Sequence, residues 1–378
     1  MISKTFCRDP WSTLYIGAES DVRTCCSGFE VLGYLKDDSL ENILHSPKAK
    51  EIRQAVLNGE WSENCRVCKE LEDSGIRSYR ATYVGEEEQH KIQNDPNYYA
   101  PTMLDIRWND TCNLACNYCG PRFSSAWARL QNVDLGLERF HYDSTLEWLK
   151  SHEDQINVVT LLGGEPLLIK DNLPLLEIIS NKNVDMHITT NLSMDIEKSK
   201  IFQAIKEFNN VTWQVSFENT STRFEYVRHG ATWDQFHKNI LLLKEYRNNR
   251  NWKIDARCNY NIYSAFDLDT FYDYLTTHEM GVRWGKLQYP EELDIMSHNK
   301  AVKELAVKEI DQVLSKYDNY VADNKYEFNF LKDLKQSILN FEYTGRSVNF
   351  IEWTTWLEQL QQKQGKFAEL WPEVNACL

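Results

Sequence analysis

The chain has 378 residues, a hydrophobic content of 42% and a formal net charge of −14. This length can bury a large core and allows more than one module. The acidic charge disfavours nucleic acid as a partner, no apolar run approaches the roughly eighteen residues of a membrane-spanning helix, and the opening residues lack the pattern of a signal peptide, so we expect a cytoplasmic protein.

Residues 1–98 are predicted to form a cysteine-rich module. A short strand is expected over Trp11 to Ile16, its hairpin partner over Val22 to Cys25, and a helix from Pro47, capped by Ser46, to Asn58. Without an export signal, cysteines are reduced thiols or metal ligands rather than disulfides. The module contains five of them: Cys7, Cys25, Cys26, Cys65 and Cys68. Four make a plausible thiolate set for an iron–sulfur cluster or a structural zinc ion. Cys25 and Cys26 compete for one place, because adjacent strand residues point to opposite faces.

A second domain is predicted over residues 99–296, after a linker from Glu86 to Pro101 that is rich in Glu, Asn, Asp and Pro. Apolar strands alternate there with amphipathic helices, which is typical of parallel βαβ units. The predicted strands cover 103–109, 157–163, 184–190, 211–217, 252–260 and 282–288. The expected fold class is therefore α/β, with a partial (β/α)6 TIM-like barrel.

These strands alternate apolar and polar side chains, as expected when one face packs on helices and the other lines an open lumen. In the fifth strand the alternating pairs are Ile254 and Asp255, Ala256 and Arg257, Cys258 and Asn259. Arg257 is therefore expected on the lumen side. Cys258, a tempting hydrogen-atom donor, is expected among the buried apolar residues instead.

Three cysteines follow the first barrel strand: Cys112, Cys116 and Cys119, separated by three and then two residues. A four-thiolate site would need another cysteine nearby, and none occurs within the next hundred residues. Three thiolates leave one iron of a [4Fe-4S] cluster open to bind a substrate or cofactor as a Lewis acid. The loop lies at the carboxyl end of a strand, where α/β folds bind ligands, and a helix is expected from about Ser124.

Further candidates stand at the ends of the next strands. Gly163 and Gly164 let the backbone approach a ligand closely, and the carboxylate of Glu165, before Pro166, can accept bonds from an ammonium group. Thr190 and Asn191 end the third strand, and Ser216 lies near the end of the fourth. The alternative for each is ordinary turn chemistry at a strand end.

Together these motifs resemble the radical S-adenosylmethionine (SAM) superfamily. The Cys-x-x-x-Cys-x-x-Cys spacing, with Tyr118 before the last cysteine, is similar to the superfamily signature. The resemblance implies that Cys112, Cys116 and Cys119 bind the catalytic [4Fe-4S] cluster, whose open iron chelates the amino and carboxylate groups of SAM. One electron then cleaves SAM to methionine and a 5′-deoxyadenosyl radical, which abstracts a hydrogen atom from the substrate.

The same resemblance implies the residues around SAM. The segment Gly163-Gly164-Glu165-Pro166 matches the motif that binds the methionine amino group. Thr190, Asn191 and Ser216 match positions that face the ribose and carboxylate. Arg257 is a candidate partner of the SAM carboxylate, with a structural ion pair to Asp255 or Glu218 as the rival interpretation.

The N-terminal cysteine pattern resembles the twitch and SPASM modules, which hold an auxiliary [4Fe-4S] cluster in many radical SAM enzymes. Here the module precedes the core instead of following it. The segment from Glu225 to Gly230, with Trp233 and Phe236 beyond it, resembles the helix–loop–helix after the fourth strand of those enzymes. Within it, His229 is either a proton donor or, as we prefer, a capping or packing residue.

Residues 297–378 are predicted to form a helical cap, by default packed on the body of the protein and otherwise covering the barrel mouth or docking a partner. Its apolar faces are Val302, Leu305, Ile310, Val313, Leu314 and Tyr317; Phe328, Leu331, Leu334, Ile338 and Phe341; and Phe350, Trp353, Trp356, Leu357 and Leu360, ending near Gln364. Cys377 is a free tail thiol, or a ligand if the terminus folds back.

The function expected from this resemblance is a radical SAM enzyme acting on a peptide or protein, or on a small molecule. Its partners would be that substrate and an electron donor such as flavodoxin or ferredoxin, with no membrane. The alternatives are a non-catalytic iron–sulfur electron-transfer or scaffold protein, and a tRNA-modifying radical SAM enzyme, which the acidic charge opposes.

Overall fold

The computed structural model describes residues 5–73, 78–83, 95–134, 142–287, 289–317, 325–340, 348–363 and 365–378. The chain divides into two compact units. The first comprises Met1–Thr111, Gly136–Ile188 and Ser199–Val211, and the second comprises Cys112–Leu135, Thr189–Lys198 and Thr212–Leu378. Most of the predicted linker 86–101, together with Phe341, Gln364 and the side chain of Phe328, lies outside the described residues.

The N-terminal part of the first unit contains the predicted hairpin. Helix α1 (Asp9–Ser12) precedes β1 (Thr13–Ile16), which pairs antiparallel with β2 (Asp21–Arg23), and β2 pairs with β3 (Gly33–Tyr34). The strand predicted from Trp11 therefore begins two residues later. Pro10 occupies the first turn of α1, where its fixed φ favours a helix.

Helices complete this part of the chain: α2 (Leu40–Leu44), α3 (Pro47–Asn58) and α4 (Arg66–Asp73), with 3-10 turns η1 (Glu63–Cys65) and η2 (Arg80–Tyr83). Helix α3 has the predicted ends. The Ser46 hydroxyl accepts from the backbone N–H of Ala49 at 3.3 Å, and Gly59 ends the helix at a φ of 78°.

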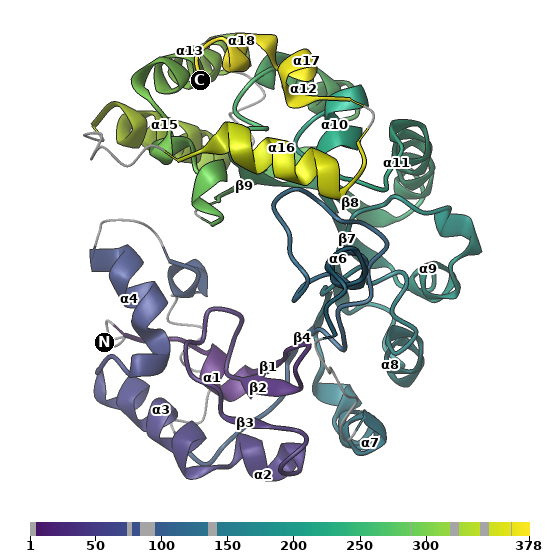
Figure 1. The fold of residues 1–378 in the computed structure, drawn as a ribbon. Coiled ribbons are helices and arrows are strands. Elements are labelled where there is room, and N and C mark those ends of the chain that lie inside the picture. Colours follow the sequence, from purple (N-terminus) through teal and green to yellow (C-terminus); the bar gives the residue numbers. More distant parts are fainter. Residues whose placement is uncertain are drawn as a thin grey trace. The chain divides into compact units, whose positions relative to one another are not determined.

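Strand β1 also joins the parallel strands that follow, which the sequence did not predict. It pairs in parallel with β4 (Met103–Ile106), in the register Thr13 to Met103 through Ile16 to Ile106. Beyond β4 the parallel order continues with β5 (Val158–Leu161) and β6 (Asp185–Thr190), whose last two residues belong to the second unit. The helices α7 (Tyr142–Ser151), α8 (Asn172–Ile178) and α9 (Lys200–Ile205) follow one another beside these strands (Figure 1). The turn η3 covers Glu153–Gln155.

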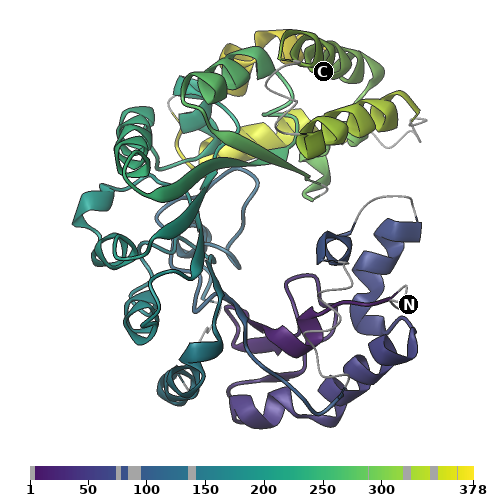
Figure 2. The same ribbon diagram turned by 180° about the vertical axis from the view of Figure 1, so that it is seen from behind.

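The second unit holds most of β7 (Asn210–Ser216) and the parallel pair β8 (Asn251–Tyr260) and β9 (Gly281–Lys286), which Figure 2 shows side by side. Buried residues alternate with partly or fully exposed ones along β6, β7 and β8, as the predicted alternation implies. Strand β4 departs from this pattern because all four of its residues are buried, including Asp105. The six predicted barrel strands are all present, the class is α/β with parallel strands, and the strands do not close into a barrel.

Helices and turns of the second unit are α6 (Ser125–Gln131), η4 (Ile196–Lys198), α10 (Ser221–Val227), α11 (Trp233–Arg247), α12 (Leu268–Thr277), η5 (Glu291–Leu293), η6 (Ile295–Ser297), α13 (Lys300–Lys316), α15 (Lys325–Asn340), α16 (Phe350–Leu360), α17 (Phe367–Leu370) and α18 (Pro372–Asn375). The helical C-terminal region is as predicted, and its apolar faces are largely buried. Trp356 is the exception at 41% exposed, although its ring stacks on Trp127.

Candidate functional site

The three-cysteine loop, residues 112–119, lies in the second unit and is fixed to helix α6. The Ser124 hydroxyl caps α6 by accepting from the Trp127 backbone N–H and donates to the Leu114 carbonyl at 2.6 Å. The Trp127 indole donates to the Cys116 carbonyl at 2.8 Å, and the Ser125 hydroxyl bonds both the N–H and the carbonyl of Cys112 at 3.1 Å. The helix predicted from Ser124 therefore anchors the loop through its first turn.

The three thiols lie close enough to influence one another electrostatically. Burial raises the pKa of Cys116 to about 12, Arg228 opposes the rise, and Cys119 and Cys112 add to it. Burial likewise raises the pKa of Cys119 to about 11, with a further contribution from Cys112. Cys112 and Cys119 are partly exposed, whereas Cys116 is buried. Three soft thiolate donors on one short loop fit a [4Fe-4S] cluster.

A buried ion pair adjoins Cys116. An Arg228 nitrogen donates to both carboxylate oxygens of Glu218 at 3.0 Å, and its other terminal nitrogen lies 3.9 Å from the Cys116 sulfur. The Tyr118 hydroxyl donates to the same carboxylate at 3.1 Å. Burial lowers the pKa of Arg228, but Glu218, Tyr118 and Cys116 together outweigh it, so the pKa is raised overall. This guanidinium therefore stays charged beside the Cys116 sulfur.

Sequence reasoning missed the role of this pair. From the sequence, Glu218 is only a rival partner of Arg257, and Arg228 is only part of a helix–loop–helix. In the structure Arg257 is exposed and makes no ion pair with Asp255 or Glu218 within the described residues; Asp255 lies 3.8 Å from Arg283 instead. The available signal is the acidic Glu218 two residues beyond the end of β7, a strand whose alternate residues are buried.

The three strand-end candidates of the second unit differ in their contacts with the cysteine loop. The Asn191 amide lies 3.7 Å from the Cys112 sulfur and donates to the Asn113 side chain at 3.2 Å. The buried Thr190 hydroxyl accepts from the Leu192 N–H at 3.0 Å, which is turn chemistry. Ser216 is half-buried at the end of β7. Asn191 is thus the strand-end residue that the structure brings to the cysteine loop.

The Gly-Gly-Glu-Pro segment belongs to the first unit and packs on the residue that precedes the cysteine loop. A Cβ on Gly164 would lie 2.3 Å from the Thr111 carbonyl oxygen, so only glycine fits there. Glu165 donates its backbone N–H to that oxygen at 2.8 Å. The Glu165 carboxylate is fully buried and accepts from the Leu167 N–H at 3.1 Å, and Pro166 is also buried.

The N-terminal cysteines also belong to the first unit. Burial raises the pKa of Cys7 well above its usual range, Asp9 raises it further, and smaller contributions come from Cys25 and Cys65. Cys65 in turn is influenced by Cys68. Asn64, next to Cys65, donates its side-chain amide to the hydroxyl of Thr24, next to Cys25, at 2.8 Å and so joins these two segments. Cys7, Cys25, Cys65 and Cys68 are therefore neighbours.

Cys26 has different surroundings from Cys25. Its side chain is exposed, and beyond burial the groups that shift its pKa are Asp105, Ser27, Asp9 and Arg107 rather than Cys7 or Cys65. Among the described residues, no group of three or more His, Cys, Asp or Glu side chains has the geometry to hold a single metal ion. A cubane places one iron behind each thiolate, so its ligands do not converge on one point.

The other residues singled out in the sequence have structural surroundings. The carbonyl of His229 accepts from the Ala115 N–H at 3.0 Å, and burial lowers the pKa of its imidazole. The buried Cys258 thiol donates to the Phe217 carbonyl at 3.1 Å. The Cys377 thiol donates to the Glu373 carbonyl at 3.4 Å in the last helix.

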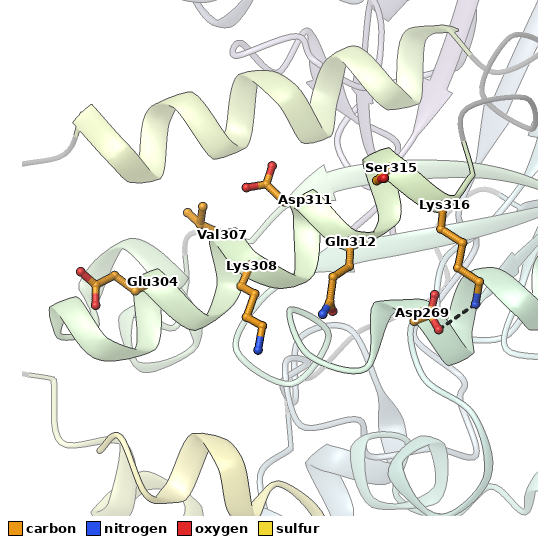
Figure 3. Close-up of a pocket in the computed structure, with 8 residues that line it drawn as sticks. All are labelled: Asp269, Glu304, Val307, Lys308, Asp311, Gln312, Ser315 and Lys316. Carbon is orange, nitrogen blue, oxygen red and sulfur yellow. Dashed lines mark hydrogen bonds and ion pairs between the residues drawn. The ribbon is translucent and has the colours of Figure 1, made fainter.

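A surface pocket of about 740 Å³ lies along α13 in the second unit (Figure 3). Its lining includes Lys308, Gln312 and Lys316 of α13, and Lys316 pairs with Asp269 of α12 at 2.8 Å. The residues that line it include none of the predicted site residues. None of the helices in the described part of the chain is long and apolar enough to cross a membrane.

Two family models match this chain, and each covers one of its two groups of cysteines. The model of the radical SAM superfamily matches residues 106–256, and that of an iron–sulfur cluster-binding domain, SPASM, matches residues 7–69. The first match implies a [4Fe-4S] cluster with SAM, and the second supports an auxiliary cluster. The SPASM match precedes the radical SAM match, as the sequence predicted.

Similar proteins cover only part of the chain. GTP 3′,8-cyclase of Aliarcobacter butzleri is 29% identical over 91 residues, covering 23% of this chain and 26% of the relative. GTP 3′,8-cyclase of Nautilia profundicola is 32% identical over 83 residues, covering 21% and 24%. The chain thus spans about a quarter of the length of these curated relatives.

Two solved structures are also similar. Native anSMEcpe with bound AdoMet has a TM-score of 0.41 and 18% identity, over 62% of this chain and 65% of that chain. Streptococcus suis SuiB bound to S-adenosylmethionine has a TM-score of 0.41 and 17% identity, over 75% and 60%. By these matches, residues 106–256 carry a radical SAM domain, and residues 7–69, on its N-terminal side, carry a SPASM iron–sulfur domain.

Proposed function

We propose that this chain is an enzyme that reductively cleaves SAM and removes a hydrogen atom from a peptide or protein substrate. The observation that carries the proposal is the grouping of Cys112, Cys116 and Cys119 on one loop, beside a buried Arg228–Glu218 pair. When bound and reduced, the cluster would supply one electron to the sulfonium of SAM, and cleavage of one carbon–sulfur bond would give methionine and a 5′-deoxyadenosyl radical. The protein then has to hold, orient and shield these groups.

The cysteines of the loop and two residues beside it would have different roles in holding the cluster. Cys112, Cys116 and Cys119 would be the cluster ligands, with Arg228 and Asn191 donating to two of the sulfurs. Donors to sulfur and a nearby cation offset the negative charge of the thiolates. Burial of Cys116 keeps water from its sulfur.

The SAM-binding set is proposed from the family motifs. Glu165, reached through Gly163 and Gly164 and followed by Pro166, would accept from the SAM ammonium group. Thr190, Asn191 and Ser216 would face the ribose and carboxylate, Tyr118 would support the site, and Arg257 would pair with the carboxylate. Thr190 has the weakest support of these, because its hydroxyl is engaged in a turn.

The auxiliary cluster would be held by Cys7, Cys25, Cys65 and Cys68. Cys25 is preferred over Cys26 because Cys25 raises the pKa of Cys7 and Cys65 raises the pKa of Cys25, whereas Cys26 is exposed. Modules of this kind occur in enzymes that modify peptides, which supports a peptide or protein substrate. Electrons would come from a small carrier such as flavodoxin or ferredoxin.

The proposal is tested by giving the anaerobically reconstituted protein dithionite and SAM and measuring 5′-deoxyadenosine by chromatography. We expect production by the wild type and by Cys377→Ala, a matched thiol control, and none by Cys116→Ala with an unchanged circular dichroism spectrum. Normal production by Cys116→Ala would refute the assignment. A protein that takes up iron and is reduced, yet never cleaves SAM, would be an electron carrier or scaffold instead.

The class of substrate is tested in separate experiments with a small molecule, a tRNA and a peptide. GTP is the small-molecule probe, because the curated relatives are named GTP 3′,8-cyclases. Its consumption together with SAM would replace the peptide proposal. Binding of tRNA at physiological salt would favour the tRNA-modifying alternative, which the net charge of −14 opposes. A short peptide encoded beside this gene, modified in the assay and identified by mass spectrometry, would support the preferred class.

A further inference from the structure

The C-terminal segment from Phe350 to Lys363 packs on the three-cysteine loop within the second unit. Leu357 of α16 is fully buried in one apolar cluster with Ala115 and Trp127, and Cys119 packs against that cluster. The Trp356 ring stacks on Trp127 with a centroid distance of 6.5 Å and an interplanar angle of 18°. Helix α16 thereby covers the apolar side of the loop.

Two polar side chains just beyond α16 bond the residues on either side of Cys116. The Gln361 amide donates to the Ala115 carbonyl at 2.8 Å, and Gln361 is 3% exposed. The Lys363 ammonium donates to the Asn117 side-chain carbonyl at 2.7 Å and also to the Tyr226 carbonyl. Each contact spans 246 residues of sequence between the C-terminal segment and the loop.

These bonds complete the support of the peptide that carries Cys116. The Ala115 N–H donates to the His229 carbonyl at 3.0 Å, and the Asn117 N–H donates to the Val227 carbonyl at 2.8 Å. The loop is therefore held by the end of α10 and the residues after it and, in addition, by Gln361 and Lys363. Removing either C-terminal side chain leaves a buried acceptor of the loop without its donor.

Lys363 also brings charge to this region. Its ammonium lies 3.8 Å from the centroid of the Tyr226 ring. The Cys116 sulfur is near enough to interact electrostatically with this ammonium. A cation near a ligand sulfur favours the more negative, reduced state of a cluster.

We propose that Gln361 and Lys363 are positioning residues of the SAM cluster, so that the C-terminal segment sets the geometry and the redox potential at Cys116. This inference rests on the proposed function. Neither residue touches the reacting atoms. They act through the peptide that carries the thiolate, and Lys363 also acts through its charge.

The experiment uses the full-length reconstituted protein and electron paramagnetic resonance of its dithionite-reduced form. The SAM cluster is identified as the spectral component that Cys116→Ala removes. Its midpoint potential and iron content are then measured in Lys363→Met, Lys363→Arg and Gln361→Leu. Lys366→Met is the matched control, because Lys366 is exposed and three residues further along the chain.

We expect Lys363→Met to shift the midpoint potential of this component to more negative values and to alter its spectrum with SAM. Lys363→Arg should restore most of both, Gln361→Leu should lower the iron content of this component, and Lys366→Met should match the wild type. The inference is overturned if Lys363→Met behaves as Lys366→Met does, or if Lys363→Arg fails to restore the potential while folding normally. A wild type without any component that depends on Cys116 would instead refute the proposed function.

Discussion

The two cysteine groups of this chain differ in how their sulfur atoms are brought together. Cys112, Cys116 and Cys119 lie on one loop of eight residues, whereas Cys7, Cys25, Cys65 and Cys68 come from three separate segments. The charged group with the largest effect also differs in sign between Cys116 and Cys7: Arg228 lowers the pKa of Cys116, whereas Asp9 raises the pKa of Cys7. The chain itself helps to hold a thiolate in the first group, and the second group depends more on the charge of a bound metal.

The largest expected effect concerns the N-terminal group. Cys25→Ser should remove one cluster's share of the iron, whereas Cys26→Ser should retain it, because Cys25 neighbours Cys7 and Cys65 and Cys26 does not. Iron and sulfide assays on the reconstituted variants measure this difference. Equal losses in both variants, or a loss confined to Cys26→Ser, would reverse the assignment, and zinc in place of iron would identify a structural knot.

The next test removes the positive charge of Arg228, which lies beside the three-cysteine loop. Arg228→Met leaves the Glu218 carboxylate buried without its ion-pair partner, so the free energy of unfolding should fall by about 3–5 kcal/mol. Tyr118→Phe removes only a hydrogen bond to the same carboxylate and should cost about 0.5–1.5 kcal/mol. Urea denaturation of the anaerobic proteins checks both values. Similar losses in the two variants would show that the ion pair does not matter to the loop.

A third test concerns the first unit. Glu165→Gln keeps an acceptor for the Leu167 N–H, so the fold should survive, but the carboxylate proposed to bind the SAM ammonium is lost. A charged hydrogen bond of about 1.5–3 kcal/mol corresponds to a rise of roughly 10- to 100-fold in the KM for SAM. The 5′-deoxyadenosine assay at varied SAM concentration gives this KM. An unchanged KM would reduce Glu165 to a turn residue.

The smallest effect concerns how acid lowers the stability of the fold through the buried His298. Burial lowers the pKa of His298 to about 4, so between about pH 6.5 and pH 4 the unfolded state binds the proton that the folded state does not. The free energy of unfolding should therefore fall as the pH falls through this range, by about 2 kcal/mol between pH 7 and pH 5. His298→Gln should lose less over the same interval, as urea denaturation at the two pH values would reveal. Identical losses would exclude His298 as the source.

The sequence predicted those parts of the fold that carry a local signal. The Ser46 and Pro47 start of α3, its Gly59 stop and the alternation along β8 follow from neighbouring residues alone. The parallel pairing of β1 with β4 does not, because a buried strand does not specify its neighbour. The radical SAM domain could be predicted because its motif lies within eight consecutive residues, 112–119. Arg228 and Lys363 contact that motif only through tertiary structure, so their roles could not be predicted from the sequence.

The pairing of β1 with β4 has a consequence for dissecting the protein. Residues 13–16 occupy the hydrogen-bonding edge of β4 from Met103 to Ile106. In a fragment that began near residue 99, the backbone N–H and C=O groups on this edge of β4 would have no partner strand, and the four residues of β4 would lose part of their cover. Such an edge can pair with strands of other molecules. Excising the cysteine-rich part would therefore produce a self-associating radical SAM domain, and the two are better studied as one polypeptide.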